Sequence, residues 1–202
     1  MKIKYNAPIV LTFAFISAIV LLLSQTAFHS LTEQWFLVPG KGGFSSGSIR
    51  NWVTLVTHAF GHANWPHLVS NFAFILLIGP ILEEVYGSAL LLVMIFVTAA
   101  VTGVLNVLFF PASLLGASGV VFMMMLLASF TNFSKGEIPL TFILVLILFL
   151  GSELFDSFGS SASGANISQF AHIVGGFIGS LFGFFRKGAA ARQKRGLESA
   201  SY

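Results

Sequence analysis

The chain has 202 residues, of which 56% are hydrophobic and only 8% are charged; the formal net charge is +3 and there is no cysteine. Soluble domains carry roughly 25% charged residues, so this composition excludes an ordinary soluble globular protein. The lack of cysteine excludes disulfides and thiolate chemistry, and the small net charge gives no reason to expect a nucleic-acid partner. The composition predicts an all-α polytopic membrane protein.

Six apolar runs are long enough, or nearly so, to cross a bilayer, which takes about 20 helical residues. They cover residues 8–28, 65–85, 88–110, 114–130, 138–155 and 167–185. The first run lacks an evident small-residue cleavage site, so we expect a helix there and not a signal peptide. The predicted organisation is a membrane domain over residues 8–186, preceded by a short N-terminus of residues 1–7 and followed by a basic tail of residues 187–202.

Lysine and arginine indicate the orientation, because they concentrate in cytoplasmic loops. With the N-terminus inside, eight of these residues are cytoplasmic: Lys2, Lys4, Lys135, Arg186, Lys187, Arg192, Lys194 and Arg195. The outer loops hold two, Lys41 and Arg50. We therefore expect both termini in the cytoplasm, a tail that attracts anionic membrane lipid, and the cytoplasmic membrane of a bacterium.

The connection over residues 29–64 is the longest loop, and it is unusually apolar for its glycine and serine content. It carries Trp35 and Trp52. Tryptophan is enriched at headgroup depth, so we expect this first loop to lie partly in the membrane interface. His58 and His62 also lie here, spaced four apart, but no glutamate follows His58 as in the H-E-x-x-H zinc pattern. A capping or loop-ordering role is the better interpretation, and we expect no metal.

Four polar side chains on three of the predicted helices share one depth. His67 and Asn71 lie near the outer entry of the second helix, Ser118 near that of the fourth, and His172 near that of the sixth. At about 1.5 Å per residue, each is within roughly 10 Å of the outer surface. Polar groups at that depth are costly unless they pair, so their clustering predicts a site. Serine needs an adjacent base, for which histidine is the usual choice, so we predict a nucleophilic Ser118 activated by His172.

The residues around this pair are suited to close helix packing. Gly116 and Gly119 flank Ser118, and glycines at 175 and 179 lie on the His172 helix, spaced by four. Phe122, one turn after Ser118, is a candidate to stack beneath the imidazole. An oxyanion formed at Ser118 would need donors, and the candidates are the Asn71 amide, the His67 ring N–H and the Ser118 backbone N–H.

Three motifs resemble those of the rhomboid family of intramembrane serine proteases: G-x-S-G at residues 116–119, A-H-x-x-G-x-x-x-G at 171–179, and H-x-x-x-N at 67–71. The resemblance covers about residues 8–186. It implies a six-transmembrane-helix bundle, Ser118 as nucleophile, His172 as general base and acid, and His67, Asn71 and the Ser118 N–H as the oxyanion hole. It further implies a serine endopeptidase without cofactor, whose substrates are transmembrane segments cleaved near their outer ends.

The same resemblance implies a structural role for Glu83 at the inner end of the second helix; by position alone, Glu83 and Glu84 would be interfacial charges at a helix end. Bacterial members commonly have tyrosine four residues after the nucleophile, where this chain has Phe122. Neither Asp156 nor Glu153 is expected to complete a triad. The fifth helix, with the small polar loop at residues 159–166, is the candidate substrate gate.

Several alternatives remain open from the sequence. His67 and Asn71 could instead form a hydrogen bond that ties the second helix to its loop. Met123, Met124 and Met125 are expected to fill core space. The whole groove could belong to a non-catalytic pseudoprotease that binds membrane proteins. A transporter ranks last, because no inverted repeat or midplane ionisable residue is visible.

Overall fold

The computed structural model describes residues 4–132 and the separate positions 140, 143, 144, 147, 175, 178, 181 and 182. Within these residues, three helices are long and apolar enough to cross a membrane: α1 (Pro8–Thr26), α4 (Trp65–Tyr86) and α5 (Ser88–Phe109). The other elements are α2 (Leu31–Trp35), α3 (Ile49–Thr57), the 3-10 helix η1 (His58–Phe60) and α6 (Ser118–Asn132). The chain is therefore an all-α polytopic membrane protein, which confirms the class predicted from composition.

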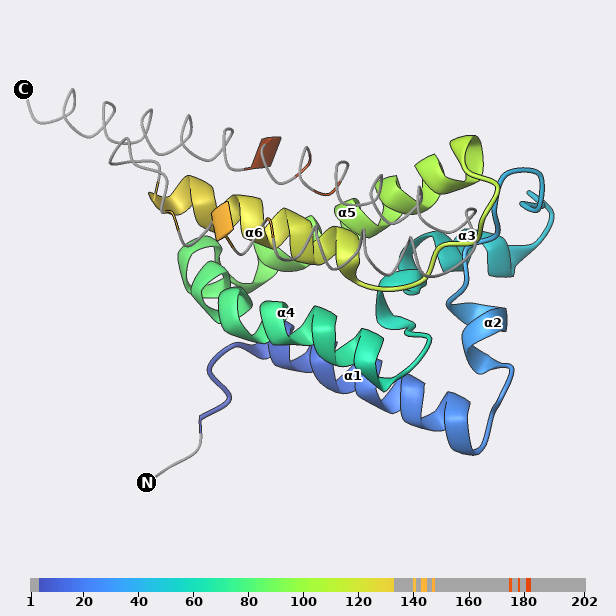
Figure 1. Cartoon of the computed structure of the whole chain (residues 1–202), viewed down its shortest axis with the longest axis horizontal. Coiled ribbons are helices and arrows are strands. Elements are labelled where there is room, and N and C mark those ends of the chain that lie inside the picture. The colour runs from blue at the N-terminus through green and yellow to red at the C-terminus, as the bar shows by residue number, and fades with distance from the viewer. Residues whose placement is uncertain are drawn as a thin grey trace, which may run out of the picture.

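The long helices lie side by side, and α4 packs against both α1 and α6 (Figure 1). Its inward face contributes Phe72 and Ile75 to the same cluster of buried residues as Met123, Met124 and Met125 of α6. All three methionines are buried, as predicted. Large apolar side chains such as Phe15, Leu77 and Phe109 remain exposed on α1, α4 and α5, which suits helices surrounded by lipid.

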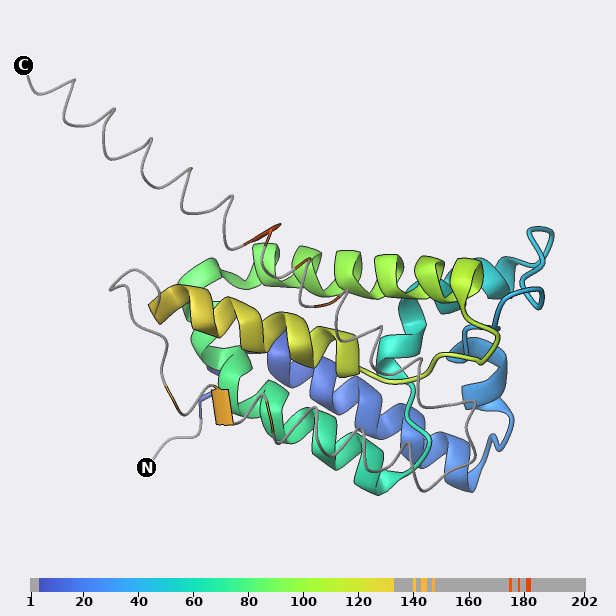
Figure 2. The same cartoon turned by 45° about the horizontal axis from the view of Figure 1, so that its top comes forward.

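The short elements α2, α3 and η1 gather at one end of the bundle, here called the loop end (Figures 1 and 2). The α4 and α6 helices begin at this end, while α1 and α5 begin at the opposite one, here called the far end. The first loop therefore contains helices that the sequence did not distinguish from coil. These helices are short, and propensity alone rarely stabilises a helix of five or nine residues.

The far end is held together by Glu83, whose side chain is only 5% exposed. Its carboxylate accepts hydrogen bonds from the backbone N–H groups of Ile9 and Val10, at 3.0 and 3.1 Å. These are two of the unpaired donors at the start of α1. The Ser88 hydroxyl donates a third bond to it, at 2.7 Å. The structural role implied for Glu83 is thus present, but Glu83 is buried between three helices, whereas Glu84 is exposed.

The fourth predicted span starts later than expected. The sequence placed its start at Leu114, but α6 begins at Ser118. Leu114 instead pairs with Val38 in an isolated antiparallel bridge, with both N–H···O distances at 3.0 Å. Gly116 then has φ +116°, which is incompatible with a right-handed helix. The expected helices over residues 138–155 and 167–185 lie almost wholly outside the described residues.

Candidate active site

His67 lies in the first turn of α4, at the loop end. Asn64 caps this helix, because its side-chain oxygen accepts the His67 backbone N–H at 2.8 Å. Pro66 follows within the first turn, where its fixed φ favours helix and its missing N–H costs nothing. The cap and the proline together fix where α4 begins. They thereby hold the imidazole at the end of the bundle where α6 also begins.

Ser118 is the first residue of α6 and is 6% exposed. The segment before it is anchored on the first loop, by the Val38–Leu114 bridge and by a bond from the Gly116 N–H to the His58 carbonyl at 3.0 Å. Since the first N–H groups of a helix have no partner within it, this position offers free backbone donors beside the serine hydroxyl. The serine is therefore buried, fixed in place and next to a helix N-terminus.

The His67 ring lies directly against the Ser118 segment. A Cβ atom added to Gly116 would lie 2.8 Å from both Cε1 and Nε2 of His67, closer than real side-chain contacts allow. The absence of a side chain at Gly116 is thus what admits the imidazole, two residues before Ser118. The structure thus brings together His67 and Gly116, two of the residues that the sequence grouped.

Asn71 is buried, with 1% of its surface exposed, one turn below His67. Its Nδ2 donates a hydrogen bond to the His67 carbonyl at 2.9 Å. This bond stays within α4, between residues one turn apart. A side-chain amide has two N–H donors, and this bond uses one of them.

The segment that follows His172 in the chain reaches the Ser118 helix. A Cβ atom on Gly175 would collide with the backbone of Gly119, with the carbonyl oxygen as its nearest atom. Two glycines therefore allow backbone to touch backbone at the residue next to Ser118. Farther along, Ile178 is buried and Phe182 packs against the main core cluster. His172 itself and Gly179 lie outside the described residues.

Other expected site features are only partly described. Phe122 is 8% exposed within the main core cluster, one turn beyond Ser118 on the same helix. The imidazole that it was expected to support belongs to His172. Asp156, Glu153 and the expected gate at residues 159–166 also lie outside the described residues.

Two further histidines, His62 and His58, lie at the loop end. The ring of His62 lies 5.0 Å from that of His67, centroid to centroid, in an edge-on arrangement, and His62 is 1% exposed. Burial, reinforced by the neighbouring His67, lowers the pKa of His62 to about 3. His58 is buried beside α5, where its Nε2 lies 3.0 Å from the Ala99 carbonyl. Burial lowers the pKa of His58 as well, so both rings are neutral at pH 7.

These contacts support the loop-ordering role expected for His58, which links η1 to α5. The sequence did not predict that His62 would touch His67, nor that α5 turns a polar face to this end of the bundle. Thr98, Thr102 and Asn106 are all buried on α5 and spaced by four. That spacing on an otherwise apolar span was the signal available in the sequence.

Comparisons with known proteins were made over the whole chain. Residues 50–188, more than half of it, match the family model described as Rhomboid domain. Rhomboid-like protein 11, chloroplastic, of Arabidopsis thaliana is 28% identical over 162 residues, which cover 74% of this chain and 58% of that protein.

Two bacterial relatives are also similar. Rhomboid protease GlpG of Haemophilus influenzae is 26% identical over 132 residues, covering 64% of this chain and 67% of that protein. Rhomboid protease GlpG of Yersinia pestis is 31% identical over 141 residues, covering 68% of this chain and 49% of that protein. This chain thus spans about half to two thirds of the length of the relatives that it matches.

Proposed function

The chain belongs to the rhomboid family, and on that premise we propose that it is an intramembrane serine endopeptidase in which Ser118 and His172 form the catalytic pair. The observation that carries this proposal is the contact of Gly175 with Gly119. His172 precedes Gly175 by three residues, about one turn if this segment is helical, and Gly119 directly follows Ser118. The backbone contact therefore supports an imidazole close to the serine hydroxyl.

In the proposed reaction the Ser118 Oγ attacks the carbonyl carbon of the scissile bond while His172 takes the hydroxyl proton. The tetrahedral intermediate collapses as His172 returns that proton to the leaving amine. A water molecule then attacks the acyl-enzyme while His172 takes one of its protons. His172 returns that proton to the Ser118 oxygen as the acid product leaves. No metal or cofactor enters this scheme.

The negative oxygen of the intermediate requires donors that already point at it. The Ser118 N–H lies at the start of α6, where no helical carbonyl competes for it. The remaining Nδ2 hydrogen of Asn71 and the ring N–H of His67 are the other two proposed donors. His67 lies against Gly116, and Asn71 follows it one turn later, so all three groups come from one end of the bundle.

We further propose that the substrates are transmembrane segments of other proteins, cut near their outer ends. The positive-inside distribution supports a loop end that faces outside and two termini that lie in the cytoplasm. The proposed catalytic domain covers residues 8–186. A plasma membrane of a bacterium is the proposed location. The burial of Ser118 below the loop end suits a substrate that enters from the lipid and is cleaved at shallow depth.

The test is cleavage of a single-span reporter protein that is reconstituted with this chain in vesicles. Ser118→Ala and His172→Ala should each lower the rate by at least about 10³-fold, because each removes one half of the reacting pair. Ser17→Ala is the matched control for the serine, since Ser17 is also buried but lies within α1. His29→Ala is the control for the histidine, and both controls should retain the wild-type rate.

Retained cleavage in either catalytic variant would overturn the assignment. A wild-type protein that binds the reporter but cleaves none of a panel of single-span substrates would instead favour the pseudoprotease alternative.

A further inference from the structure

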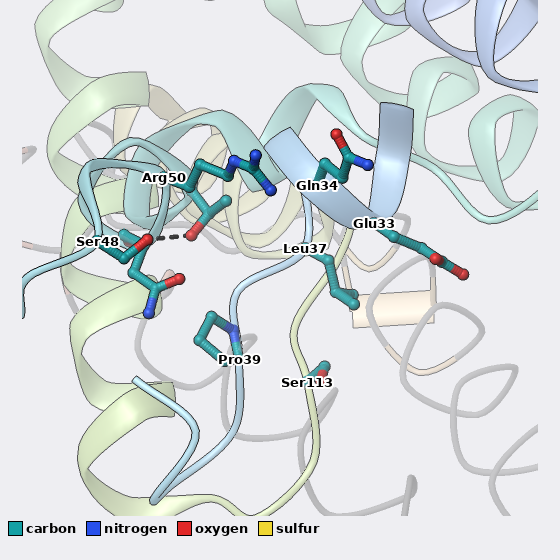
Figure 3. A pocket seen from close by; sticks show the side chains of 9 residues that line it. Glu33, Gln34, Leu37, Pro39, Ser48, Arg50 and Ser113 are labelled. Atoms are coloured by element: carbon teal, nitrogen blue, oxygen red, sulfur yellow. Dashed lines mark hydrogen bonds between the residues drawn. The ribbon is translucent and has the colours of Figure 1, made fainter. Parts of the chain in front are cut away.

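A cavity separate from the Ser118 site opens among α2, α3 and the segments around Leu37 and Ser113 (Figure 3). Its volume is about 310 Å³, at the small end for ligand pockets. None of Ser118, His67 and Asn71 lines it. Its size and its opening to the surface suit a small polar group that is part of a larger ligand, the rest of which stays outside the cavity.

The cavity carries one charge of each sign, from different helices. Glu33 lines it from α2 and Arg50 lines it from α3 (Figure 3). Within the described part of the chain these two side chains form no ion pair with each other. The Arg50 guanidinium instead lies over the Trp35 ring, 5.6 Å from its centroid, in a cation–π arrangement that restrains it. Two separated, opposite charges in one cavity match a ligand that itself carries both.

The remaining polar lining adds neutral hydrogen-bonding groups. Ser48 and Ser113 contribute hydroxyl groups to the lining, and Asn51 contributes an amide, of which one N–H already donates to the Ser45 carbonyl at 3.4 Å. The Thr54 hydroxyl donates to the Asn51 carbonyl at 2.9 Å and so is already used. A guanidinium with nearby hydroxyl and amide donors is well suited to phosphate oxygens.

The surroundings of the cavity indicate where such a ligand comes from. On α3, Ile49 is 78% exposed and Trp52 is 55% exposed, and Trp35 on α2 is 39% exposed. Large apolar and tryptophan side chains that are exposed on short helices outside the spans are typical of the membrane interface. The cavity therefore opens at the depth of phospholipid headgroups.

We propose that this cavity binds the phosphoethanolamine headgroup of a membrane phospholipid, with Arg50 on the phosphate and Glu33 on the ammonium. The acyl chains run over the exposed Ile49 and Trp52 side chains. A primary ammonium donates hydrogen bonds to a carboxylate, whereas a choline headgroup has no N–H and needs an aromatic cage. No aromatic side chain is among the described residues that line the cavity, and the nearby Trp35 ring is already covered by the Arg50 guanidinium.

The cavity lies between the first loop and the segment that leads to Ser118. Ser113, which lines it, directly precedes Leu114 and its bridge to Val38. A bound headgroup contacts α2, α3 and this segment together. It thus stabilises the attachment of the Ser118 segment to the first loop.

The test is lipid retention by the full-length protein in detergent, measured by native mass spectrometry with phosphatidylethanolamine, phosphatidylcholine or phosphatidylglycerol added at equal concentrations. Phosphatidylethanolamine should be retained about tenfold more than either other lipid. Arg50→Gln and Glu33→Gln should each lower its retention about tenfold, since each removes a charge-assisted contact. Lys41→Gln and Glu84→Gln, which alter exposed charges outside the cavity, should leave retention unchanged.

Arg50→Lys and Glu33→Asp keep each charge and should restore most of the retention, which separates charge recognition from damage to the loop. Equal retention of the three lipids, or equal loss in the cavity and control variants, would overturn the proposal. Displacement by free phosphoethanolamine at the concentration of the lipid would overturn the lipid assignment in favour of a soluble ligand. None of these readouts depends on cleavage, so this proposal and the proposed function stand or fall separately.

Discussion

The described part of the bundle has a buried polar cluster at each end, and the two clusters differ in how completely their hydrogen-bonding groups are paired. At the far end, the Glu83 carboxylate accepts three hydrogen bonds, from Ile9, Val10 and Ser88. At the loop end, the His62 Nε2 and the Asn106 Oδ1 have no hydrogen-bond partner among the described residues. A buried polar group left unpaired is costly, so a fold retains it where something other than packing requires it.

The two ends also differ in how tightly their backbone is packed. Each end has a glycine at positive φ, Gly87 (φ +80°) at the far end and Gly116 (φ +116°) at the loop end. A Cβ on Gly87 would meet open space, whereas one on Gly116 would lie 2.8 Å from the His67 ring. Strained backbone and incomplete hydrogen bonding are typical of functional sites. The comparison therefore favours a role in stability for the Glu83 cluster and supports the proposed role in chemistry for the cluster around His67, and each role can be tested separately.

The largest expected effect is at His67. His67→Ala should lower the cleavage rate by about 10³-fold, because it removes one donor to the developing oxyanion. The midpoint of thermal unfolding in detergent should move far less than the rate does. His29→Ala is the control. A large loss of stability with normal cleavage by the folded fraction would place His67 in the structural class and remove the contrast between the two ends.

At the far end the expected effect falls on stability. Glu83→Ala should lower the free energy of unfolding by about 3 kcal/mol, since three donors lose their charged acceptor. The neighbouring Glu84→Ala, which alters an exposed carboxylate, should change it by less than about 0.5 kcal/mol. Denaturant unfolding measures both variants. If Glu83→Ala reduced the cleavage rate per folded molecule as strongly as His67→Ala, the division of labour would be wrong.

Gly116 tests whether the strained segment is required. Gly116→Ala should cost about 2 kcal/mol, because it adds a Cβ at positive φ and within 2.8 Å of the His67 ring. We also expect slower cleavage, because His67 must move. Gly42→Ala provides the control: Gly42 has φ +86° but open space around it, so it shares only the backbone cost. Equal behaviour of the two variants would mean that the contact with His67 is unimportant.

The smallest expected effect is a pH dependence arising from His62. Its pKa is about 3 in the folded chain and 6.5 when unfolded, so the unfolded state binds more protons as the pH falls below 6.5. Stability should therefore be full above pH 6.5 and fall by about 1.4 kcal/mol at pH 5.5. Replacing the ring in His62→Gln should remove that part of the slope. An unchanged slope would show that His62 is not the group responsible, leaving His58, whose pKa is lowered in the same direction.

The sequence predicted the long helices well and the short-range geometry poorly. The bounds of α4 and α5 differ from the expected ones by a single residue at one end, and α1 ends two residues early. Apolar length alone was enough to place them. The start of α6 was misplaced because the Val38–Leu114 bridge is a tertiary contact that no local pattern reveals.

The sequence grouped the candidate site residues but did not give their arrangement. Motif spacing grouped His67, Asn71 and Ser118, and the structure places the His67 ring against the segment that leads to Ser118. The contact of His62 with His67 depends on how η1 turns into α4, which spacing does not determine. The burial of Glu83 depends likewise on the approach of α1, where Gly79 admits Val10.

The most direct test of the account is labelling with a fluorophosphonate, which reacts only with an activated serine, followed by mass spectrometry of the modified peptide. The account predicts a single adduct at Ser118 in the wild-type protein and none in folded His172→Ala, while His29→Ala labels normally. Failure to label Ser118, or labelling that persists when His172 is replaced, would contradict the claim that these two residues form the catalytic pair.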